Sequence, residues 1–279
     1  MSPAAEQSSG AVESLWRYPV KSMAGEEVDA SEVSGRGLVG DRAYAVIDNE
    51  TGKVASAKNP RKWPELLSFG AAFAKPPRPG APLPEVSITL PDGTGVTSGQ
   101  PDVDAALSRA LHRHVRLRAA EPTSPNPRTA RAEEYWPDLE GLDYRDTVTD
   151  FDLPEGTFFD VAVVHVLTTA TLSRLGELYP QGRMATRRFR PNIVLDVGGA
   201  AGFVENEWVG RTLHIGAQVQ LAINEPCPRC VMITLPQGDL PKDSGILRTA
   251  AQHNKTFVGV YASVLRGGQI RRGDSITVR

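Results

Sequence analysis

Short runs in which apolar and polar residues alternate recur along the chain and predict a protein built mainly from β-strands. Strands are expected at residues 12–18, 43–47, 86–90, 193–197, 213–215, 219–223, 257–265 and 276–278. One longer apolar run, from Phe158 to Leu167, has the continuous hydrophobic character of a buried strand. Many short strands separated by turn residues are typical of β-barrel cores.

Two segments show the apolar spacing of helices that pack on one face. The first follows Asp102, a common N-cap residue, and has apolar residues at Val103, Ala106, Leu107, Ala110 and Leu111. The second is expected from Ala170 to Leu178, capped by Thr168 or Thr169 and ended by Pro180. The predicted fold class is therefore α+β, mainly β, with barrel cores and a few peripheral helices.

The stretch from Glu121 to Trp136 separates the two halves of the chain. It is rich in Pro, Ser, Thr and Arg and holds few aliphatic residues, which is typical of an irregular linker. A chain of 279 residues is long enough for one large domain or for two small domains with separate cores. We place the boundary at the end of this linker, which gives domains at 11–135 and 136–279.

Charge and composition exclude several classes of partner. The formal net charge is −2 and basic residues are not interleaved with aromatic residues, so neither nucleic acid nor a membrane surface is an expected partner. No apolar run approaches the length of a membrane span, and residues 1–10 lack the apolar core of a signal peptide. Two cysteines in a chain of this length fit a reducing compartment, so a cytoplasmic location is expected.

The two cysteines lie three residues apart, in the sequence Pro226-Cys227-Pro228-Arg229-Cys230. Apolar residues at 219–223 and 231–233 predict strands on both sides, and the prolines should stiffen the loop between them. Arg229 places a permanent cation beside the thiols and favours the thiolate form, which binds metals and attacks electrophiles. This loop is therefore the first candidate for chemistry.

Four interpretations of the cysteine pair are open from the residues alone. In the first, both cysteines are small buried apolar residues. The second, a structural zinc site, needs further ligands, and the 5 histidines show no ligand spacing. The third, a thioredoxin-like redox pair, fits the spacing, although its active cysteine normally opens a helix and strand-like residues follow here. The fourth is a single thiolate bound to a softer metal.

Several charged or polar residues elsewhere are candidates for a binding site. Lys21 and Ser22 follow the first predicted strand, and Arg42 precedes the second. Arg190 is the last of four closely spaced arginines and lies just before a predicted strand, whereas Asp160 lies near the start of the long apolar run. Taken singly, each also fits a structural role as a solvated lysine, a surface ion pair, a basic loop or a turn carboxylate.

These stretches occur together in an order that is typical of one family. The motifs are Tyr18-Pro19-Val20-Lys21-Ser22, Asp41-Arg42, Asp160, Phe189-Arg190-Pro191-Asn192-Ile193-Val194, Cys227-Pro228-Arg229-Cys230 and Val258-Gly259-Val260-Tyr261. On these motifs the chain resembles the MOSC superfamily of molybdenum-cofactor proteins, in the branch that includes the mitochondrial amidoxime-reducing component and the bacterial YcbX proteins. The resemblance implies an N-terminal MOSC β-barrel domain at 11–135 and a MOSC domain at 136–279.

The resemblance also implies a cofactor, in which molybdenum is bound to molybdopterin and to one cysteine thiolate of the protein. By position that metal ligand is Cys230, and Asp160 is the carboxylate close to the metal. The residues that would hold the cofactor are Lys21, Ser22, Arg42, Arg190, Asn192, Arg229 and Tyr261. The chain departs from the family pattern at Val161 and Ala162, where relatives often have small polar residues, and at Pro228, where they often have Ser or Thr.

The activity that the resemblance implies is reduction of small N-hydroxylated compounds, such as amidoximes and hydroxylamines, with Cys230 and Asp160 as catalytic residues. The sequence contains neither the cysteines for an iron–sulfur cluster nor a nucleotide-binding glycine fingerprint, so an external ferredoxin or flavoprotein is the expected electron donor. Two alternatives are a protein that carries the molybdenum cofactor, or sulfur for it, without turnover, and a metal-free dithiol oxidoreductase that uses both cysteines.

Overall fold

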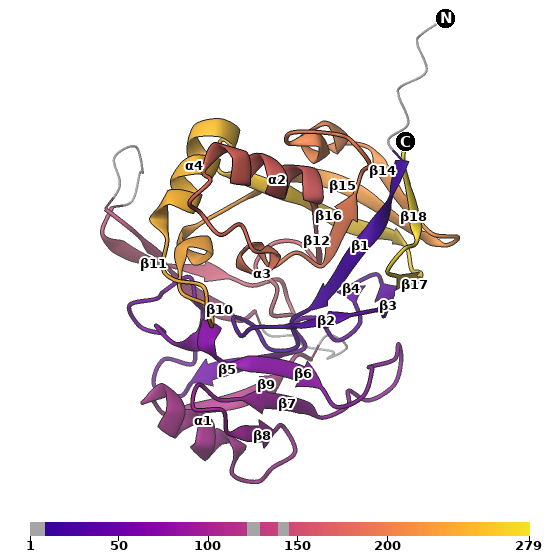
Figure 1. Cartoon of the computed structure of the whole chain (residues 1–279). Helices are drawn as coiled ribbons and strands as arrows, with labels where there is room; N and C mark the ends of the chain where they lie inside the picture. The colour runs from indigo at the N-terminus through magenta and orange to yellow at the C-terminus, as the bar shows by residue number, and fades with distance from the viewer. Residues whose placement is uncertain (1–8, 122–128, 139–144) are drawn as a thin grey trace, which may run out of the picture.

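Seven strands form a closed barrel in which the first strand of the chain lies among strands of its second half. The computed structural model describes residues 9–121, 129–138 and 145–279. Around the barrel the strand order is β13-β12-β16-β15-β14-β18-β1, and β1 pairs with β13 to close it. Figure 1 shows β1 and β18, from opposite ends of the chain, side by side in this barrel. The barrel strands are β1 (Ser9–Arg17), β12 (Val164–Thr168), β13 (Ile193–Asp196), β14 (Thr212–Ile215), β15 (Val219–Pro228), β16 (Phe257–Arg266) and β18 (Ser275–Val278).

A group of shorter sheets lies below the barrel in the view of Figure 1. Strand β5 pairs with β9, the strands β6, β7 and β8 form one sheet, and β10 and β11 form a hairpin. These strands are β5 (Tyr44–Asp48), β6 (Gly70–Phe73), β7 (Val86–Thr89), β8 (Gly95–Thr97), β9 (Val115–Ala119), β10 (Arg131–Trp136) and β11 (Thr147–Asp152). The helix α1 (Val103–Leu111) and the 3₁₀ turn η1 (Leu66–Ser68) also belong to this part.

The two parts exchange strands. Besides β1, which also pairs with β2 (Glu26–Val28), strand β17 (Gly268–Arg271) pairs with β3 (Ala30–Ser34), which in turn pairs with β4 (Gly37–Leu38). The predicted boundary between residues 135 and 136 stays a prediction.

Two helices cover the outside of the barrel. Figure 1 shows α2 (Thr169–Leu178) and α4 (Ser244–Asn254) next to each other at the top of the molecule. Between them and the barrel lies a small core to which Leu175, Phe189 and Ile246 contribute. The remaining elements are α3 (Thr186–Phe189), η2 (Val204–Trp208) and η3 (Val231–Thr234).

The cysteine loop and the residues after it pack against two hydrophobic cores outside the barrel interior. The barrel interior is filled by residues such as Leu15, Leu213 and Val260. Immediately after Cys230, Met232 belongs to the core of the smaller sheets, whereas Ile233 belongs to the core under α2 and α4. Packing on both sides therefore fixes the segment that follows the cysteines.

The mainly β, α+β class predicted from the sequence is confirmed, with a closed barrel and a few helices. The predicted helix at 103–111 is α1, although the Asp102 side chain makes no capping hydrogen bond. The predicted helix at 170–178 is α2, and the Thr168 hydroxyl caps it by accepting from the Thr171 N–H at 3.1 Å. Among the helices described, none combines the length and the apolarity needed to cross a bilayer.

Two predictions about the linker and the long apolar run are wrong in part. Residues 131–136 of the expected irregular linker form strand β10, because Ala132 is fully buried and the whole segment pairs with β11; residues 122–128 lie outside the described residues. Of the strand expected at 158–167, only the part from Val164 is extended. The Phe158 carbonyl accepts a hydrogen bond from Lys21 Nζ at 2.9 Å, and this contact belongs to a bend that carries Asp160.

The predictions around the cysteines also need correction. The strand expected at 231–233 is the 3₁₀ turn η3, which the Thr234 hydroxyl closes by donating to the Val231 carbonyl at 2.7 Å. Strand β15 continues through Pro228, with irregular pairing to β16 at the prolines, so the loop itself is shorter than expected. Helix α4 was not predicted, although Asp243 caps it by accepting from the Gly245 N–H at 2.9 Å.

Candidate functional site

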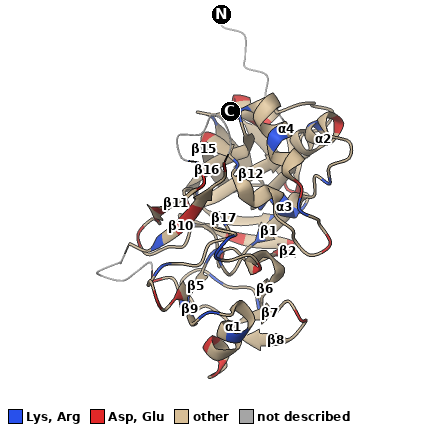
Figure 2. Ribbon diagram, turned by 90° about the vertical axis from the view of Figure 1, so that its left-hand side faces the viewer, with Lys and Arg blue, Asp and Glu red and all other residues tan. Residues whose placement is uncertain are grey.

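The predicted site residues come from separate segments that meet between the barrel and the smaller sheets. Lys21 and Ser22 follow β1, Asp160 precedes β12, Arg190 precedes β13, and the cysteines lie at the end of β15. Figure 2 shows charged residues of both signs at the level where the barrel meets the smaller sheets. Residues that are far apart in the sequence are therefore brought into one region.

A buried tyrosine lies against two of the predicted arginines. Tyr18 is 1% exposed, and its hydroxyl donates to the Pro191 carbonyl at 3.1 Å. The guanidinium carbons of Arg42 and Arg190 lie 4.7 and 4.1 Å from the centroid of its ring, so two cations face one ring. Burial raises the pKa of Tyr18, which therefore stays neutral.

The two arginines differ in their partners. Arg42 forms an ion pair with Asp41, which raises the pKa of Arg42 although burial acts in the opposite direction. Arg190 is 6% exposed and donates from Nη1 to the Met23 carbonyl at 2.6 Å, and it forms no ion pair with a carboxylate in the described part of the chain. Burial, together with the neighbouring Arg42, lowers the pKa of Arg190 to about 10. Arg190 is thus a buried cation that forms no ion pair with any carboxylate in residues 9–121, 129–138 and 145–279.

Asp160 lies between two lysines. Lys21 Nζ forms an ion pair with Asp160, and Lys58 Nζ lies 3.7 Å from the other carboxylate oxygen. Burial raises the pKa of Asp160, but Lys21 and Lys58 outweigh it and hold the pKa below the usual range. The Asp160 side chain is 30% exposed, so an ionised carboxylate faces an accessible space.

Cys230 is the more accessible thiol of the pair. It is half-buried directly before η3, and burial raises its pKa, whereas the nearby Lys58 acts to lower it. Lys58 also lies 3.5 Å from Glu134 on β10. Lys58 therefore influences both Asp160 and Cys230, and it belongs to the site although sequence reasoning did not identify it.

Cys227 has a different environment. It is 0% exposed, and Arg229 Nη1 donates to its sulfur at 2.7 Å. Burial raises the pKa of Cys227, but Arg229 together with His165 and Tyr261 lowers it to about 6. Because this thiolate in turn raises the pKa of Arg229, the two side chains form an ion pair between a buried sulfur and a half-buried guanidinium. Tyr261 thus lies next to Cys227.

Asn192 and Ser22 are engaged with the protein itself. The Asn192 side chain accepts from the His165 N–H at 3.1 Å and donates to Asp41 at 2.9 Å, so it orients the carboxylate that holds Arg42. The Ser22 hydroxyl accepts from the Ala57 N–H at 3.0 Å, which places the segment carrying Lys58 beside the first loop. Direct contact of either residue with a cofactor stays a prediction.

Three of the predicted binding residues have a left-handed backbone. The φ angle is 66° at Ser22, 47° at Arg42 and 53° at Arg190. This conformation costs a residue with a Cβ on the order of 1–3 kcal/mol, and such residues cluster at ligand sites. The strain is consistent with loops shaped for binding.

The donors of this site fit an anionic ligand. Besides the unpaired charge of Arg190, the Arg229 Nε–H is buried and has no hydrogen-bond partner among the described residues. Phosphate oxygens accept strong, charge-assisted hydrogen bonds from arginine. In the residues that the structure describes, no three of His, Cys, Asp and Glu gather into a metal-binding group, so these side chains could offer a metal beside Cys230 at most two ligands. The residues present therefore fit a phosphate-bearing group that brings most of its own metal ligands.

Of the four closely spaced arginines, only Arg190 enters the site. Arg183 and Arg187 are exposed and pair with Asp239. Arg188 is 0% exposed and donates to the backbone carbonyls of Arg183, Ile233, Leu235 and Pro241, which fixes the loops behind the site.

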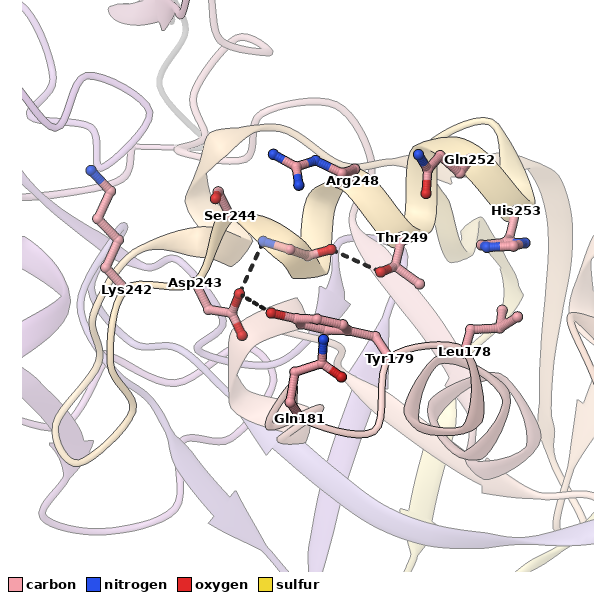
Figure 3. Close-up of a pocket in the computed structure, with 11 residues that line it drawn as sticks. Leu178, Tyr179, Gln181, Lys242, Asp243, Ser244, Arg248, Thr249, Gln252 and His253 are labelled. Carbon is pink, nitrogen blue, oxygen red and sulfur yellow. Dashed lines mark hydrogen bonds between the residues drawn. The ribbon is translucent and has the colours of Figure 1, made fainter.

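A pocket of about 480 Å³ beside α4 is separate from this site, and Figure 3 shows its lining. Its central polar contact is the Tyr179 hydroxyl, which donates to Asp243 at 3.1 Å. Asp243 is the N-cap of α4, and the Tyr179 ring packs so closely on Gly245 that an added Cβ would lie 2.4 Å from it. These contacts hold the helix in place, and none of the predicted site residues lines this pocket.

Comparison with known proteins matches both parts of the chain to family models. Residues 9–111 match the MOSC N-terminal beta barrel domain, and residues 155–277 match the MOSC domain. The rat mitochondrial amidoxime reducing component 2 is 24% identical over 97% of this chain and 83% of its own length. The human mitochondrial amidoxime-reducing component 1 is 26% identical over 82% of this chain and 67% of its own length. A solved structure, the YUAD protein of Bacillus subtilis, aligns with 98% of this chain and 97% of its own at a TM-score of 0.49 and 11% identity.

Proposed function

We propose a function for this chain from the premise that it belongs to the MOSC proteins that carry an N-terminal MOSC β-barrel domain. The chain binds a molybdenum cofactor and uses it to reduce small N-hydroxylated compounds, such as amidoximes and hydroxylamines. The names of its curated relatives, amidoxime-reducing components, support this activity.

One observation carries the proposal: the buried Arg190 forms no ion pair with a carboxylate among the described residues, and Arg229, next to the half-buried Cys230 in the sequence, keeps an unused N–H donor. Desolvated cations are costly unless an anion compensates them. A phosphate-bearing cofactor bound through Cys230 would supply that anion.

The roles of the residues follow from their contacts. When bound, the cofactor would supply a metal centre that exchanges two electrons, as removal of oxygen from nitrogen requires. Cys230 would be its protein ligand, since a thiolate suits a soft, redox-active metal. The further residues that would hold the cofactor are Lys21, Ser22, Arg42, Arg190, Asn192, Arg229 and Tyr261.

Asp160 and Lys58 would act on the substrate. Asp160 stays ionised between its lysines and is partly exposed, so it can accept a hydrogen bond from an N–H or O–H of the substrate. Lys58 stays protonated, because Asp160, Cys230 and Glu134 outweigh the effect of burial and raise its pKa. Its ammonium group can donate a hydrogen bond to the oxygen that leaves. Together the two residues would orient the N–O bond.

Electrons would come from an external ferredoxin or flavoprotein in the cytoplasm. Reduction of an N-hydroxyl group to the parent base and water consumes two electrons and two protons. The sequence contains no glycine fingerprint for a nicotinamide or flavin nucleotide. A protein donor that binds near the site would therefore deliver the electrons.

To test the proposal, the chain is expressed in a host that makes molybdenum cofactor. The metal content of the purified protein is then measured, together with its turnover of benzamidoxime with reduced viologen as the electron donor. Bound molybdenum with benzamidine formation supports the proposal. Bound molybdenum without turnover of any N-hydroxylated compound would instead indicate a carrier of the cofactor. Turnover by metal-free protein that depends on both cysteines would indicate a dithiol oxidoreductase and contradict the proposal.

A further inference from the structure

We propose that Cys227 is a positioning residue whose sulfur fixes the Arg229 guanidinium beside the cofactor site, and that it is neither a metal ligand nor half of a redox pair. The effect on cofactor binding rests on the proposed function, whereas the Cys227–Arg229 interaction does not.

The Arg229 side chain is held from two directions. Its Nη1 donates to Cys227 Sγ at 2.7 Å, and its Nη2 donates to the Phe189 carbonyl at 2.9 Å. The Arg229 backbone N–H is also engaged, with the Thr256 carbonyl at 3.0 Å. With both terminal nitrogens fixed, the guanidinium has a single orientation, in which the buried Nε–H is a donor without a partner among the described residues. Phe189 immediately precedes Arg190, so the same contacts connect Arg229 to the next arginine of the site.

The surroundings of the sulfur come from three neighbouring barrel strands. Cys227 lies on β15, Tyr261 on β16 and His165 on β12, and His165 is the direct cross-strand partner of Tyr261. The His165 Nε2 lies 3.0 Å from the Val258 carbonyl, which orients the ring. Gly259, at φ 82°, makes this approach possible, because an added Cβ would lie 2.3 Å from His165 Nε2.

These neighbours favour an anionic sulfur at neutral pH. The charged and titratable groups that act on Cys227 are Arg229, His165 and Tyr261, and with them its pKa lies at about 6 despite complete burial. An uncharged thiol is a weak acceptor, whereas a thiolate accepts a charge-assisted hydrogen bond and offsets the charge of the half-buried guanidinium.

The same geometry argues against a redox pair. In dithiol oxidoreductases the thiol with the low pKa is partly exposed, so that it can attack a substrate. Here the thiol with the low pKa is 0% exposed, and the more accessible Cys230 has its pKa raised by burial. A bond between the two sulfurs would also remove the acceptor that holds Arg229.

A spectroscopic titration of the cofactor-free chain tests the interaction without any molybdenum. In the Cys230→Ser variant Cys227 is the one remaining thiol, so far-ultraviolet thiolate absorbance reports on it alone, with Cys227→Ser/Cys230→Ser as the blank. We expect thiolate absorbance at neutral pH, and Arg229→Gln in the same background should move the midpoint up by at least one unit. Absorbance that rises only near the ordinary thiol pKa of about 8.5, with or without Arg229, would overturn the proposal.

A second measurement tests the consequence for the cofactor. In full-length protein from a cofactor-competent host, Cys227→Ser should lower retained pterin and molybdenum roughly tenfold, since hydrogen bonds to charged groups are of that strength. Cys227→Asp, which restores an anionic acceptor, should recover more cofactor than Cys227→Ala. Full retention in Cys227→Ser would refute the positioning role. If the wild-type chain itself retains no molybdenum, the proposed function fails, and the titration alone decides the role of Cys227.

Discussion

Replacing Arg190 with methionine should make the cofactor-free protein more stable and should abolish binding of the cofactor. Arg190 is 6% exposed, and it forms no ion pair with a carboxylate among the residues described. The expectation is unusual, because removal of a buried, hydrogen-bonded side chain normally destabilises a protein.

The magnitude follows from the pKa of Arg190. Its fall from 12.5 to about 10 corresponds to about 3 kcal/mol against the charged form, at ~1.4 kcal/mol per unit. Methionine removes this cost but loses the hydrogen bond to the Met23 carbonyl and the contact with Tyr18, each worth about 1 kcal/mol. The net gain is on the order of 1 kcal/mol, or roughly 2–4 °C in Tm for a chain of this size.

Arg17 supplies a matched control. It is 4% exposed and lies 5.2 Å from the Phe73 ring centroid, but it forms an ion pair with Glu26 at 2.8 Å. Arg17→Met leaves that carboxylate unpaired and should cost about 3 kcal/mol. Thermal unfolding of both cofactor-free variants, with molybdenum content of both from a cofactor-competent host, makes the comparison. A loss of stability in Arg190→Met equal to that in Arg17→Met, or full cofactor content in Arg190→Met, would refute the reasoning.

Three further predictions follow from the charges. Asp160→Asn leaves the buried Lys21 without its carboxylate partner and should lower the free energy of unfolding by about 3 kcal/mol at neutral pH. Burial lowers the pKa of Lys21, so Lys21 becomes neutral at alkaline pH, and the loss of stability measured by chemical unfolding should shrink there. Burial raises the pKa of Glu205 in the folded protein above its ordinary value of 4.5, so the contribution of Glu205 to stability is present at low pH and is lost as the pH rises through and above 4.5. The Tm of Glu205→Gln should therefore equal that of the wild type near pH 4 and exceed it near pH 8. Equal Tm values at both pH values would contradict this. The cofactor-loaded chain should be inactive with NADH alone and active with reduced viologen, and sustained turnover with NADH would mean that a nucleotide site had been missed.

The sequence was sufficient for most of the barrel because strands leave a short-range signal. Alternation and apolar runs such as Val219–Ile223 depend only on neighbouring residues, and the corresponding strands are present. The failures occur where distant contacts decide the local structure. Asp160 lies in a bend held by Lys21, and Met232 and Ile233 pack into two different cores, which an apolar run cannot reveal.

The candidate site shows the same division. Motifs in a recognisable order placed Lys21, Arg42, Arg190 and the cysteines in one region, which the structure brings together. Lys58 escaped notice because a lysine in a polar loop has no local signal; its position depends on the hydrogen bond between Ser22 and the Ala57 backbone. The opposite pKa shifts of the two thiols likewise depend on distant residues, because Tyr261 reaches Cys227 only through the pairing of strands that lie far apart in the sequence.

The most direct test of the central claim is the molybdenum content per chain of the purified wild-type protein and of Cys230→Ser, both from one cofactor-competent host. The Cys230→Ser variant keeps the size of the side chain and leaves the buried Cys227 untouched. An unchanged Tm of the cofactor-free variant would show that it still folds. The account predicts molybdenum approaching one atom per chain in the wild type and none above background in the variant. Equal molybdenum in both proteins, or none in the wild type, would contradict it.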